Sequence, residues 1–261
     1  MFNFKKKYGQ YFLTDKNLLN AIVKDAEIDK DDFVIEIGAG AGALTGVLSS
    51  HAKKVVAFEI DNELKEILTS LNLKNVTFRF EDFMKVDLKE FDEPFKVVAN
   101  LPYYITTPII FKLLEESGNL LSLTVMVQKE VAERMVADTN GDYGVLSVML
   151  AFYGEAKITR IVKRNMFYPE PNVDSAVVTI KIEKKYAVDK QAFYKFVKTA
   201  FSMRRKTLFN NLALAFSKEK LKQTFDEEFL RRRAESLTID EFVEAYKKIL
   251  GQTPTPLARL G

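Results

Sequence analysis

An amide, a proline and an aromatic ring follow one another in Asn100, Leu101, Pro102 and Tyr103, directly after an apolar run. The exocyclic amine of adenine is a poor nucleophile because its lone pair is delocalised, so a site that alkylates it must hold both amine hydrogens on acceptors. The Asn100 side-chain oxygen and the Leu101 carbonyl can be those acceptors, since Pro102 fixes the turn and supplies no competing donor. Tyr103 can stack on an unstacked base. Taken alone, the four residues would fit a proline-stabilised loop with a core tyrosine better.

A glycine-rich turn supplies a second candidate site. Gly38, Gly40 and Gly42 follow an apolar run in the sequence EIGAGAGAL, where glycine lets the backbone approach a ligand. Glu59 ends the next apolar run about 20 residues later, where a carboxylate would meet ribose hydroxyls. This spacing indicates a nucleotide-like cofactor. A dinucleotide stays open, because Gly38, Gly40 and Ala43 also satisfy G-x-G-x-x-A, and so does a plain tight turn.

The end of the following run narrows the choice of cofactor. Asp82 stands there in the sequence FEDF, and its carboxylate can accept a hydrogen bond from an adenine amino group. Phe83 can pack on the adenine ring. An NAD-dependent dehydrogenase would share the glycine turn and Glu59, but it has no use for the stretch that begins at Asn100.

Composition excludes several other kinds of chemistry. The chain has 261 residues, 47% of them hydrophobic, which is ample for a main core and a smaller second unit. It has no cysteine and one histidine, His51, so we expect no disulfide, no thiolate nucleophile and no metal site. No apolar run approaches the roughly 20 residues of a bilayer span, and the opening residues lack the apolar core of a secretory signal. We therefore expect a cytoplasmic protein without a membrane segment.

Basic residues are bunched, although the net charge is only +3. The bunches are Lys5–Lys7, Arg160–Arg164, Arg204–Lys206 and Arg231–Arg233. A local basic face is what a phosphate backbone contacts, but each bunch alone would fit a solvated surface equally well.

Short apolar runs alternate with helical patterns over the first two thirds of the chain. The predicted strands are 32–38, 54–61, 76–82, 95–100 and 123–128. Strands separated by helices predict parallel pairing with right-handed crossovers, hence an α/β, doubly wound, Rossmann-like sheet. Two later runs, near Ile158 and from Asp174, predict a closing antiparallel pair.

A smaller all-helical C-terminal domain is expected beyond Tyr186, where the pattern becomes helical throughout. The predicted domains are therefore 1–185 and 186–261. Within the second, Thr238 and Glu241 have the spacing of a capping box.

Seven motifs together give the chain a resemblance to the small-subunit ribosomal RNA adenine dimethyltransferases. They are KKYGQYFL (6–13), EIGAGAGALT (36–45), FEID (58–61), NLPYYITTPI (100–109), DYGVLSV (142–148), FYPEPNVDSAVV (167–178) and FSMRRKTLFNNL (201–212). The resemblance implies S-adenosylmethionine as methyl donor. It also implies transfer of two methyl groups to N6 of each of two adjacent adenosines, in a hairpin loop near the 3′ end of 16S rRNA in the small ribosomal subunit.

The resemblance also implies roles for individual residues. Cofactor contacts would come from Tyr11, Leu13, Gly38, Gly40, Glu59, Ile60, Asp82, Phe83 and Asn100. The family usually has Asn or His at position 11, so at Tyr11 a backbone contact is favoured over a side-chain contact. Asn100, Leu101 and Tyr103 would act on the target base, and Phe167 would be the second stacking surface. The RNA-binding residues would be Arg204, Arg205, Lys206, Arg231, Arg232 and Arg233.

Two further alternatives stay open. The related large-subunit RNA dimethyltransferases that confer macrolide resistance commonly read Asn-Ile-Pro-Tyr and lack RRKTLFNNL, so the motifs here favour the small-subunit enzymes. A second alternative is a mainly non-catalytic factor in small-subunit biogenesis whose basic faces dock on RNA. In either case we expect a monomer.

Overall fold

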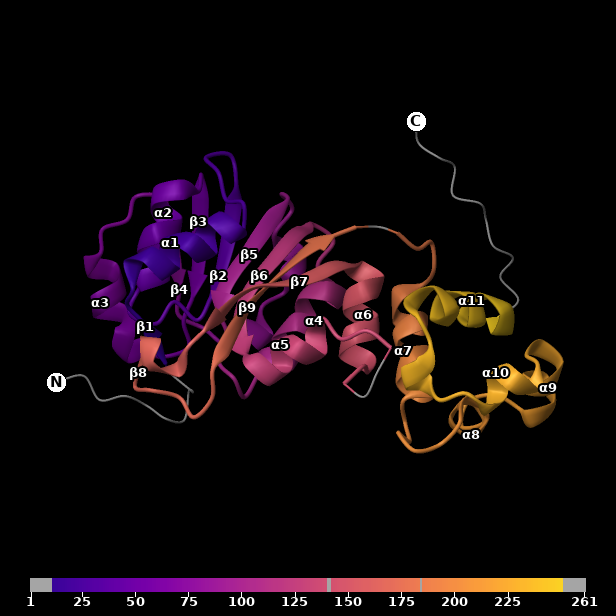
Figure 1. The fold of residues 1–261 in the computed structure, drawn as a ribbon. Coiled ribbons are helices and arrows are strands. Elements are labelled where there is room, and N and C mark those ends of the chain that lie inside the picture. Colours follow the sequence, from indigo (N-terminus) through magenta and orange to yellow (C-terminus); the bar gives the residue numbers. More distant parts are fainter. Residues whose placement is uncertain (1–10, 140–141, 184, 251–261) are drawn as a thin grey trace. The chain divides into compact units, whose positions relative to one another are not determined.

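The computed structural model describes residues 11–139, 142–183 and 185–250. The bunch Lys5–Lys7 and positions 6–10 of the first motif lie outside the described residues. The chain forms two compact units (Figure 1). The first runs to residue 133 and resumes from 155 to 182; the second comprises 134–154 and the chain from 183 onward.

A mixed sheet in the order β4-β3-β2-β5-β6-β9-β7 forms the centre of the first unit. Its strands are β2 Phe33–Ile37, β3 Lys54–Phe58, β4 Val76–Arg79, β5 Phe95–Asn100, β6 Leu120–Gln128, β7 Gly154–Val162 and β9 Ser175–Ile182. The pairs β2–β3, β2–β5, β3–β4 and β5–β6 are parallel, and β9 is antiparallel to β6. The predicted doubly wound α/β fold is confirmed.

A second, two-stranded sheet was not foreseen from the sequence. β1, Phe12–Leu13, pairs antiparallel with β8, Phe167–Tyr168, with Leu13 opposite Phe167. Neither strand is long enough for an alternating pattern to be read, because each contributes only two residues.

Helices cover the sheet because each buries one apolar face (Figure 1). Those between the strands are α1 Lys16–Asp25, α2 Ala43–His51, α3 Lys65–Ser70, α4 Thr106–Glu116 and α5 Lys129–Met135. α1 begins after Asp15, whose carboxylate accepts from the Leu18 amide at 2.8 Å and so caps the helix.

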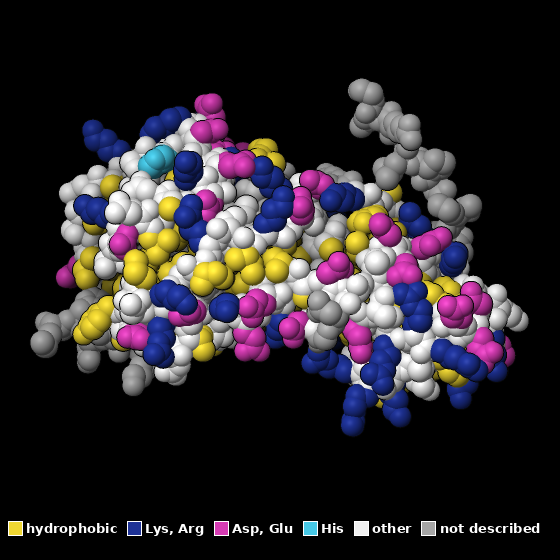
Figure 2. All heavy atoms as spheres, viewed as in Figure 1, with side chains coloured by type: hydrophobic (Ala, Val, Ile, Leu, Met, Phe, Trp, Pro, Cys, Tyr) yellow, Lys and Arg dark blue, Asp and Glu magenta, His cyan; other side chains and the backbone are white. Residues whose placement is uncertain are grey.

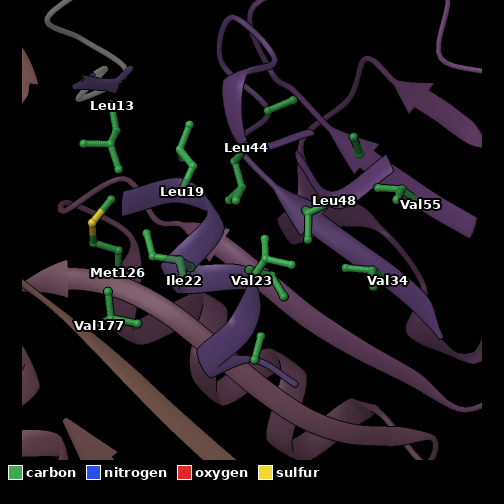
Figure 3. Packing of buried hydrophobic residues seen from close by; sticks show 14 of the residues in the cluster. Leu13, Leu19, Ile22, Val23, Val34, Leu44, Leu48, Val55, Met126 and Val177 are labelled. Atoms are coloured by element: carbon green, nitrogen blue, oxygen red, sulfur yellow. The ribbon is translucent and has the colours of Figure 1, made fainter. Parts of the chain in front are cut away.

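Charged side chains lie on the outside (Figure 2), while aliphatic side chains of α1, α2 and the strands meet in one cluster (Figure 3). The strand β2 is buried at every position, as expected for a central parallel strand. Burying one such Val, Leu or Ile side chain stabilises the fold by about 1.5–3 kcal/mol. The cluster also includes Leu13 and Phe167, so it anchors the two-stranded sheet to the main one.

The second unit is mainly helical. Its helices are α6 Val145–Tyr153, α7 Lys190–Ala200, α8 Leu208–Leu212, α9 Lys218–Thr224, α10 Glu227–Arg231 and α11 Ile239–Leu250. Aromatic rings form its core: Phe193 stacks on Phe152 at 4.6 Å and meets Tyr246 edge-on at 5.5 Å. The chain passes between the units after residues 133, 154 and 182, and the predicted division at residue 185 did not include the grouping of 134–154 with the C-terminal helices.

Candidate active site

An open cavity of about 1170 Å³ lies at the carboxyl ends of the parallel strands. Most of its lining comes from 11–13, 36–40, 58–60, 81–84 and 99–105. Carboxyl ends of parallel strands share one edge of a sheet, and ligands bind there in open α/β folds. The cavity therefore brings together the glycine turn, Glu59, Asp82 and the stretch that begins at Asn100.

Two backbone amides, one of them from the glycine turn, hold the Glu59 carboxylate in place. Gly40 donates to Glu59 Oε2 at 2.8 Å, and Asp61 donates to Oε1 at 2.9 Å. Glu59 is 5% exposed, and burial raises the pKa of its carboxyl above the ordinary value. Each carboxylate oxygen can accept more than one hydrogen bond, so both can still accept from ligand hydroxyls.

The residues after β4 form another wall. Asp82 Oδ1 accepts from the Met84 amide at 3.0 Å, which closes a short turn over Phe83–Lys85. Phe83 is buried and meets Phe58 edge-on at 5.1 Å, so its ring is fixed. Ile60 is exposed and adds an apolar surface to the same cavity.

The orientation of the Asn100 amide follows from one hydrogen bond. Its Nδ2 donates to the carbonyl oxygen of Tyr11 at 3.1 Å. A carbonyl oxygen can only accept, so the nitrogen must face Tyr11 and Oδ1 is the other atom. Oδ1 accepts no hydrogen bond from any residue that the structure describes. The Leu101 amide donates to the Met126 carbonyl at 3.1 Å, which fixes the next peptide of the stretch.

Tyr103 is held at its hydroxyl and at its ring. The hydroxyl lies 2.6 Å from Ser175 Oγ, and the Tyr11 ring lies 5.2 Å from the Tyr103 ring at an interplanar angle of 30°. Burial raises the pKa of the Tyr103 phenol, so it remains protonated at neutral pH. Tyr103 is therefore a fixed aromatic surface in the cavity and not a base.

Phe167 lies apart from these residues. It is 4% exposed, packs in the hydrophobic cluster with Leu13 and is not among the residues that line the cavity. The structure thus places Tyr11, Leu13, Asn100, Leu101 and Tyr103 at the cavity, but not Phe167.

Glu36 is a cavity residue that sequence reasoning missed. It is 1% exposed as the last residue but one of β2, and its Oε2 has no hydrogen-bond partner in the described chain. Burial raises the pKa of the Glu36 carboxyl to about 8; the neighbouring Thr45 hydroxyl opposes this rise, and the nearby Glu59 carboxylate adds to it. The sequence feature that could have identified Glu36 is a carboxylate inside an otherwise apolar strand. Burying an acid without a partner costs free energy, so an acid at such a position indicates a ligand that supplies the partner.

The predicted RNA-binding residues fall into two groups in the second unit. Arg204, Arg205 and Lys206 are exposed in the turn between α7 and α8, on a face where Lys and Arg side chains gather (Figure 2). The buried Asn211 shapes this turn, since its amide donates to the Ala200 carbonyl at 2.7 Å and accepts from the Met203 amide at 3.0 Å.

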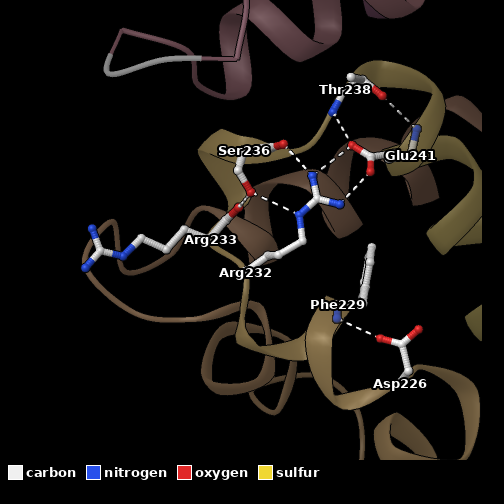
Figure 4. Close-up of polar contacts among 7 residues, drawn as sticks. All are labelled: Asp226, Phe229, Arg232, Arg233, Ser236, Thr238 and Glu241. Atoms are coloured by element: carbon white, nitrogen blue, oxygen red, sulfur yellow. Dashed lines mark hydrogen bonds and ion pairs between the residues drawn. The ribbon is translucent and has the colours of Figure 1, made fainter.

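The second group is mostly committed to internal ion pairs. Arg232 makes two hydrogen bonds to Glu241, at 2.5 and 3.0 Å, and a further one to the Ser236 carbonyl (Figure 4). Glu241 also accepts from the Thr238 amide at 2.8 Å, which confirms the predicted capping box of α11. Arg231 pairs with Glu227, whereas Arg233 extends away from this cluster (Figure 4).

The described residues show neither a metal site nor a membrane-spanning helix. No group of three or more His, Asp or Glu residues in residues 11–139, 142–183 and 185–250 could hold a metal ion. None of the helices within those ranges is long and apolar enough to cross a bilayer.

Comparison with known proteins gives concordant matches. Residues 1–249 match the family model described as ribosomal RNA adenine dimethylase. The chain is 45% identical to ribosomal RNA small subunit methyltransferase A of Clostridium acetobutylicum, over 92% of both chains. It is 47% identical to the protein of that name from Bacillus licheniformis, over 92% of this chain and 89% of the relative.

Two solved structures share the fold over nearly the whole chain. A dimethyladenosine transferase from Plasmodium falciparum superposes with a TM-score of 0.81 at 25% identity, covering 92% of this chain and 98% of that one. The 23S rRNA methyltransferase ErmE gives a TM-score of 0.72 at 25% identity, covering 91% and 99%.

Replacing Glu36 by Gln should change how stability depends on pH. The folded-state pKa of about 8 is above the ordinary value of 4.5, so the stability that Glu36 contributes is complete below pH 4.5 and is lost as the pH rises through 8. Without ligand, the Glu36→Gln protein should therefore gain stability relative to the parent between pH 5 and pH 9. Urea unfolding at both pH values measures this, with the exposed Glu66→Gln as control. An equal difference at both pH values would contradict the buried position of the acid.

Replacing Phe167 by Ala should lower stability, because the ring is part of the core. A Phe→Ala change in a core costs about 3–5 kcal/mol, which is measurable as a lower urea midpoint. Phe167→Leu removes the ring but keeps most of the apolar volume, so this variant distinguishes a packing role of Phe167 from a stacking role of its ring. A Phe167→Ala protein with the parent's stability would show that the ring is not part of the core.

Proposed function

This chain belongs to the ribosomal RNA adenine dimethylase family, and we propose that it methylates small-subunit ribosomal RNA with S-adenosylmethionine as donor. The products would be two adjacent N6,N6-dimethyladenosines in the 3′-terminal hairpin loop of 16S rRNA. The observation that carries this proposal is the identity of 41–47% to relatives named small subunit methyltransferase A, extending over more than nine tenths of this chain.

The cavity residues fit S-adenosylmethionine by their chemistry. Glu59 would accept from the ribose hydroxyls, and Asp82 from the adenine amino group, with Phe83 and Ile60 against the ring. The unpartnered Glu36 carboxylate would face the ammonium group of the methionine part, because a cation is what a buried acid lacks. When bound, the cofactor supplies an electrophilic methyl group on its sulfonium sulfur.

Asn100 and Leu101 would activate the amine by hydrogen bonding. Asn100 Oδ1 and the Leu101 carbonyl would each accept one N6 hydrogen, so that the lone pair leaves conjugation and is directed toward the methyl group. The hydrogen bond from Nδ2 to Tyr11 supports this role, because it presets the acceptor before the base arrives. Transfer leaves a cationic amine that loses its proton to water. A catalytic histidine is therefore unnecessary.

Tyr103 would stack on the flipped adenine. Phe167 remains the proposed second stacking surface, although its ring is buried in the hydrophobic cluster. The exposed basic turn Arg204–Lys206 would contact phosphates, and Arg233 has a more available side chain than Arg232. We further propose that the protein acts as a monomer in the cytoplasm.

One experiment tests the proposed function against its alternatives. The protein is incubated with labelled S-adenosylmethionine and, in separate reactions, undermethylated small subunits or large subunits, and the modified bases are mapped. Dimethylation of the two adjacent small-subunit adenosines is expected. Label in large-subunit RNA would favour the large-subunit RNA dimethyltransferases that confer macrolide resistance. Subunit binding without label transfer would favour a non-catalytic assembly factor.

Asn100→Ala should lower the single-turnover rate of methylation by on the order of a hundredfold, the usual cost of losing one pre-positioned hydrogen-bonding group. The melting temperature should change little, because the Tyr11 carbonyl can accept a hydrogen bond from solvent in the variant. Normal methylation by folded Asn100→Ala protein would refute the acceptor role.

Replacing Arg204, Arg205 and Lys206 together should weaken subunit binding and reduce its salt dependence by roughly one unit of slope per lost phosphate contact. S-adenosylmethionine affinity should stay the same. The charge-matched control replaces the exposed Lys218, Lys220 and Lys222 of α9. Equal effects of the two triple changes would mean that only total charge matters, and unchanged affinity in the first would exclude the turn as a contact.

A further inference from the structure

The hydroxyl groups of Tyr103 and Ser175 form a close pair at the cavity edge. Their oxygens are 2.6 Å apart although the residues are 72 positions apart in the sequence. Ser175 is completely buried, and its hydroxyl makes no other hydrogen bond within the described part of the chain. A buried hydroxyl that has a single hydrogen-bond partner is left without any hydrogen bond when that partner is removed.

The sheet order explains how the two residues meet. Tyr103 follows β5, and Ser175 is the first residue of β9, with β6 between them. β9 runs antiparallel to β6, so its first residue pairs with Gln128, the last residue of β6. The start of β9 therefore lies at the same edge as the carboxyl ends of the parallel strands, and Tyr103 reaches it across the end of β6.

The backbone around Ser175 is fixed without help from its hydroxyl. The Asp174 carbonyl accepts from the Lys129 amide at 2.9 Å, and the Asp174 carboxylate accepts from the Arg164 amide at 3.0 Å. Deleting the Ser175 oxygen should thus remove one hydrogen bond and leave the strand in place.

The two contacts of Tyr103 restrict different degrees of freedom. The phenol oxygen lies on the axis about which the ring rotates, so a hydrogen bond there fixes where the ring points but not its plane. The Tyr11 ring, 5.2 Å away and tilted by 30°, limits the plane. Without the Ser175 contact, the half-buried Tyr103 side chain could turn toward solvent.

We propose that Ser175 is a positioning residue for methylation: its hydroxyl holds the Tyr103 ring in the orientation that receives the target adenine. This inference rests on the proposed function, in which Tyr103 stacks on that base. It assigns Ser175 no contact with the base or the cofactor.

Steady-state methylation of undermethylated small subunits by Ser175→Ala tests the proposal. Losing one hydrogen bond with a typical net contribution of about 0.5–1.5 kcal/mol should lower the kcat/KM of Ser175→Ala for the RNA roughly 2- to 13-fold. Tyr103→Phe, which keeps the ring and removes the hydroxyl, should cause a similar loss. Adding Ser175→Ala to Tyr103→Phe should then cost little more, because the shared hydrogen bond is already absent. S-adenosylmethionine affinity, measured by calorimetry, should be the same in all variants.

Thr179→Ala is the matched control. Its hydroxyl lies on β9 and pairs with the Thr124 hydroxyl of β6 at 3.1 Å, outside the residues that line the cavity. A comparable loss of kcat/KM in Thr179→Ala would mean that Ser175 acts only through strand stability, and would overturn the proposal. Additive losses in the Ser175→Ala/Tyr103→Phe double variant, or parent-like kcat/KM in Ser175→Ala, would overturn it as well. Failure of the parent protein to methylate subunits would instead refute the proposed function.

Discussion

The parallel register of β2, β3 and β5 is the constraint on which the rest of the site depends. Parallel strands end at the same edge, so the segments that follow them must meet there whatever their distance along the chain. The glycine turn after β2, Glu59 after β3 and Asn100 at the end of β5 are juxtaposed for this reason. The helices and the apolar cluster contribute by burying the side chains of these strands.

Two buried acids in this site are stabilised in different ways. Glu59 accepts two backbone hydrogen bonds, from Gly40 and Asp61, which offset part of the free-energy cost of burying its carboxylate. Glu36 has an oxygen without a partner and a pKa raised to about 8. A cationic ligand bound beside Glu36 would favour the ionised form of this carboxyl, so binding of such a ligand and folding stability are thermodynamically linked.

The small sheet of β1 and β8 links the N-terminal segment to the cavity. Leu13 and Phe167 are opposite each other in that sheet and both pack in the main cluster. Their burial fixes the neighbouring Tyr11, whose carbonyl orients Asn100 and whose ring contacts Tyr103. Apolar packing at one end of this segment thus fixes Tyr11 at the other end, and Tyr11 contacts both the Asn100 amide and the Tyr103 ring.

Local patterns in the sequence determined the elements and most of the cavity. Alternating apolar runs and helices indicated a parallel sheet. The cavity residues Gly38, Glu59, Asp82 and Asn100 were predicted because each stands where such a run ends. The capping box at Thr238 was predicted from its spacing to Glu241. Only the tertiary structure decided which distant partners these residues have: the Tyr11 carbonyl for Asn100, Ser175 for Tyr103, Glu241 for Arg232 and the core for Phe167. The physical reason is range. Helical and strand periodicity and turn chemistry are set by neighbours in the chain, whereas a hydrogen bond across 89 or 72 residues depends on strand order, register and packing, which no short segment contains.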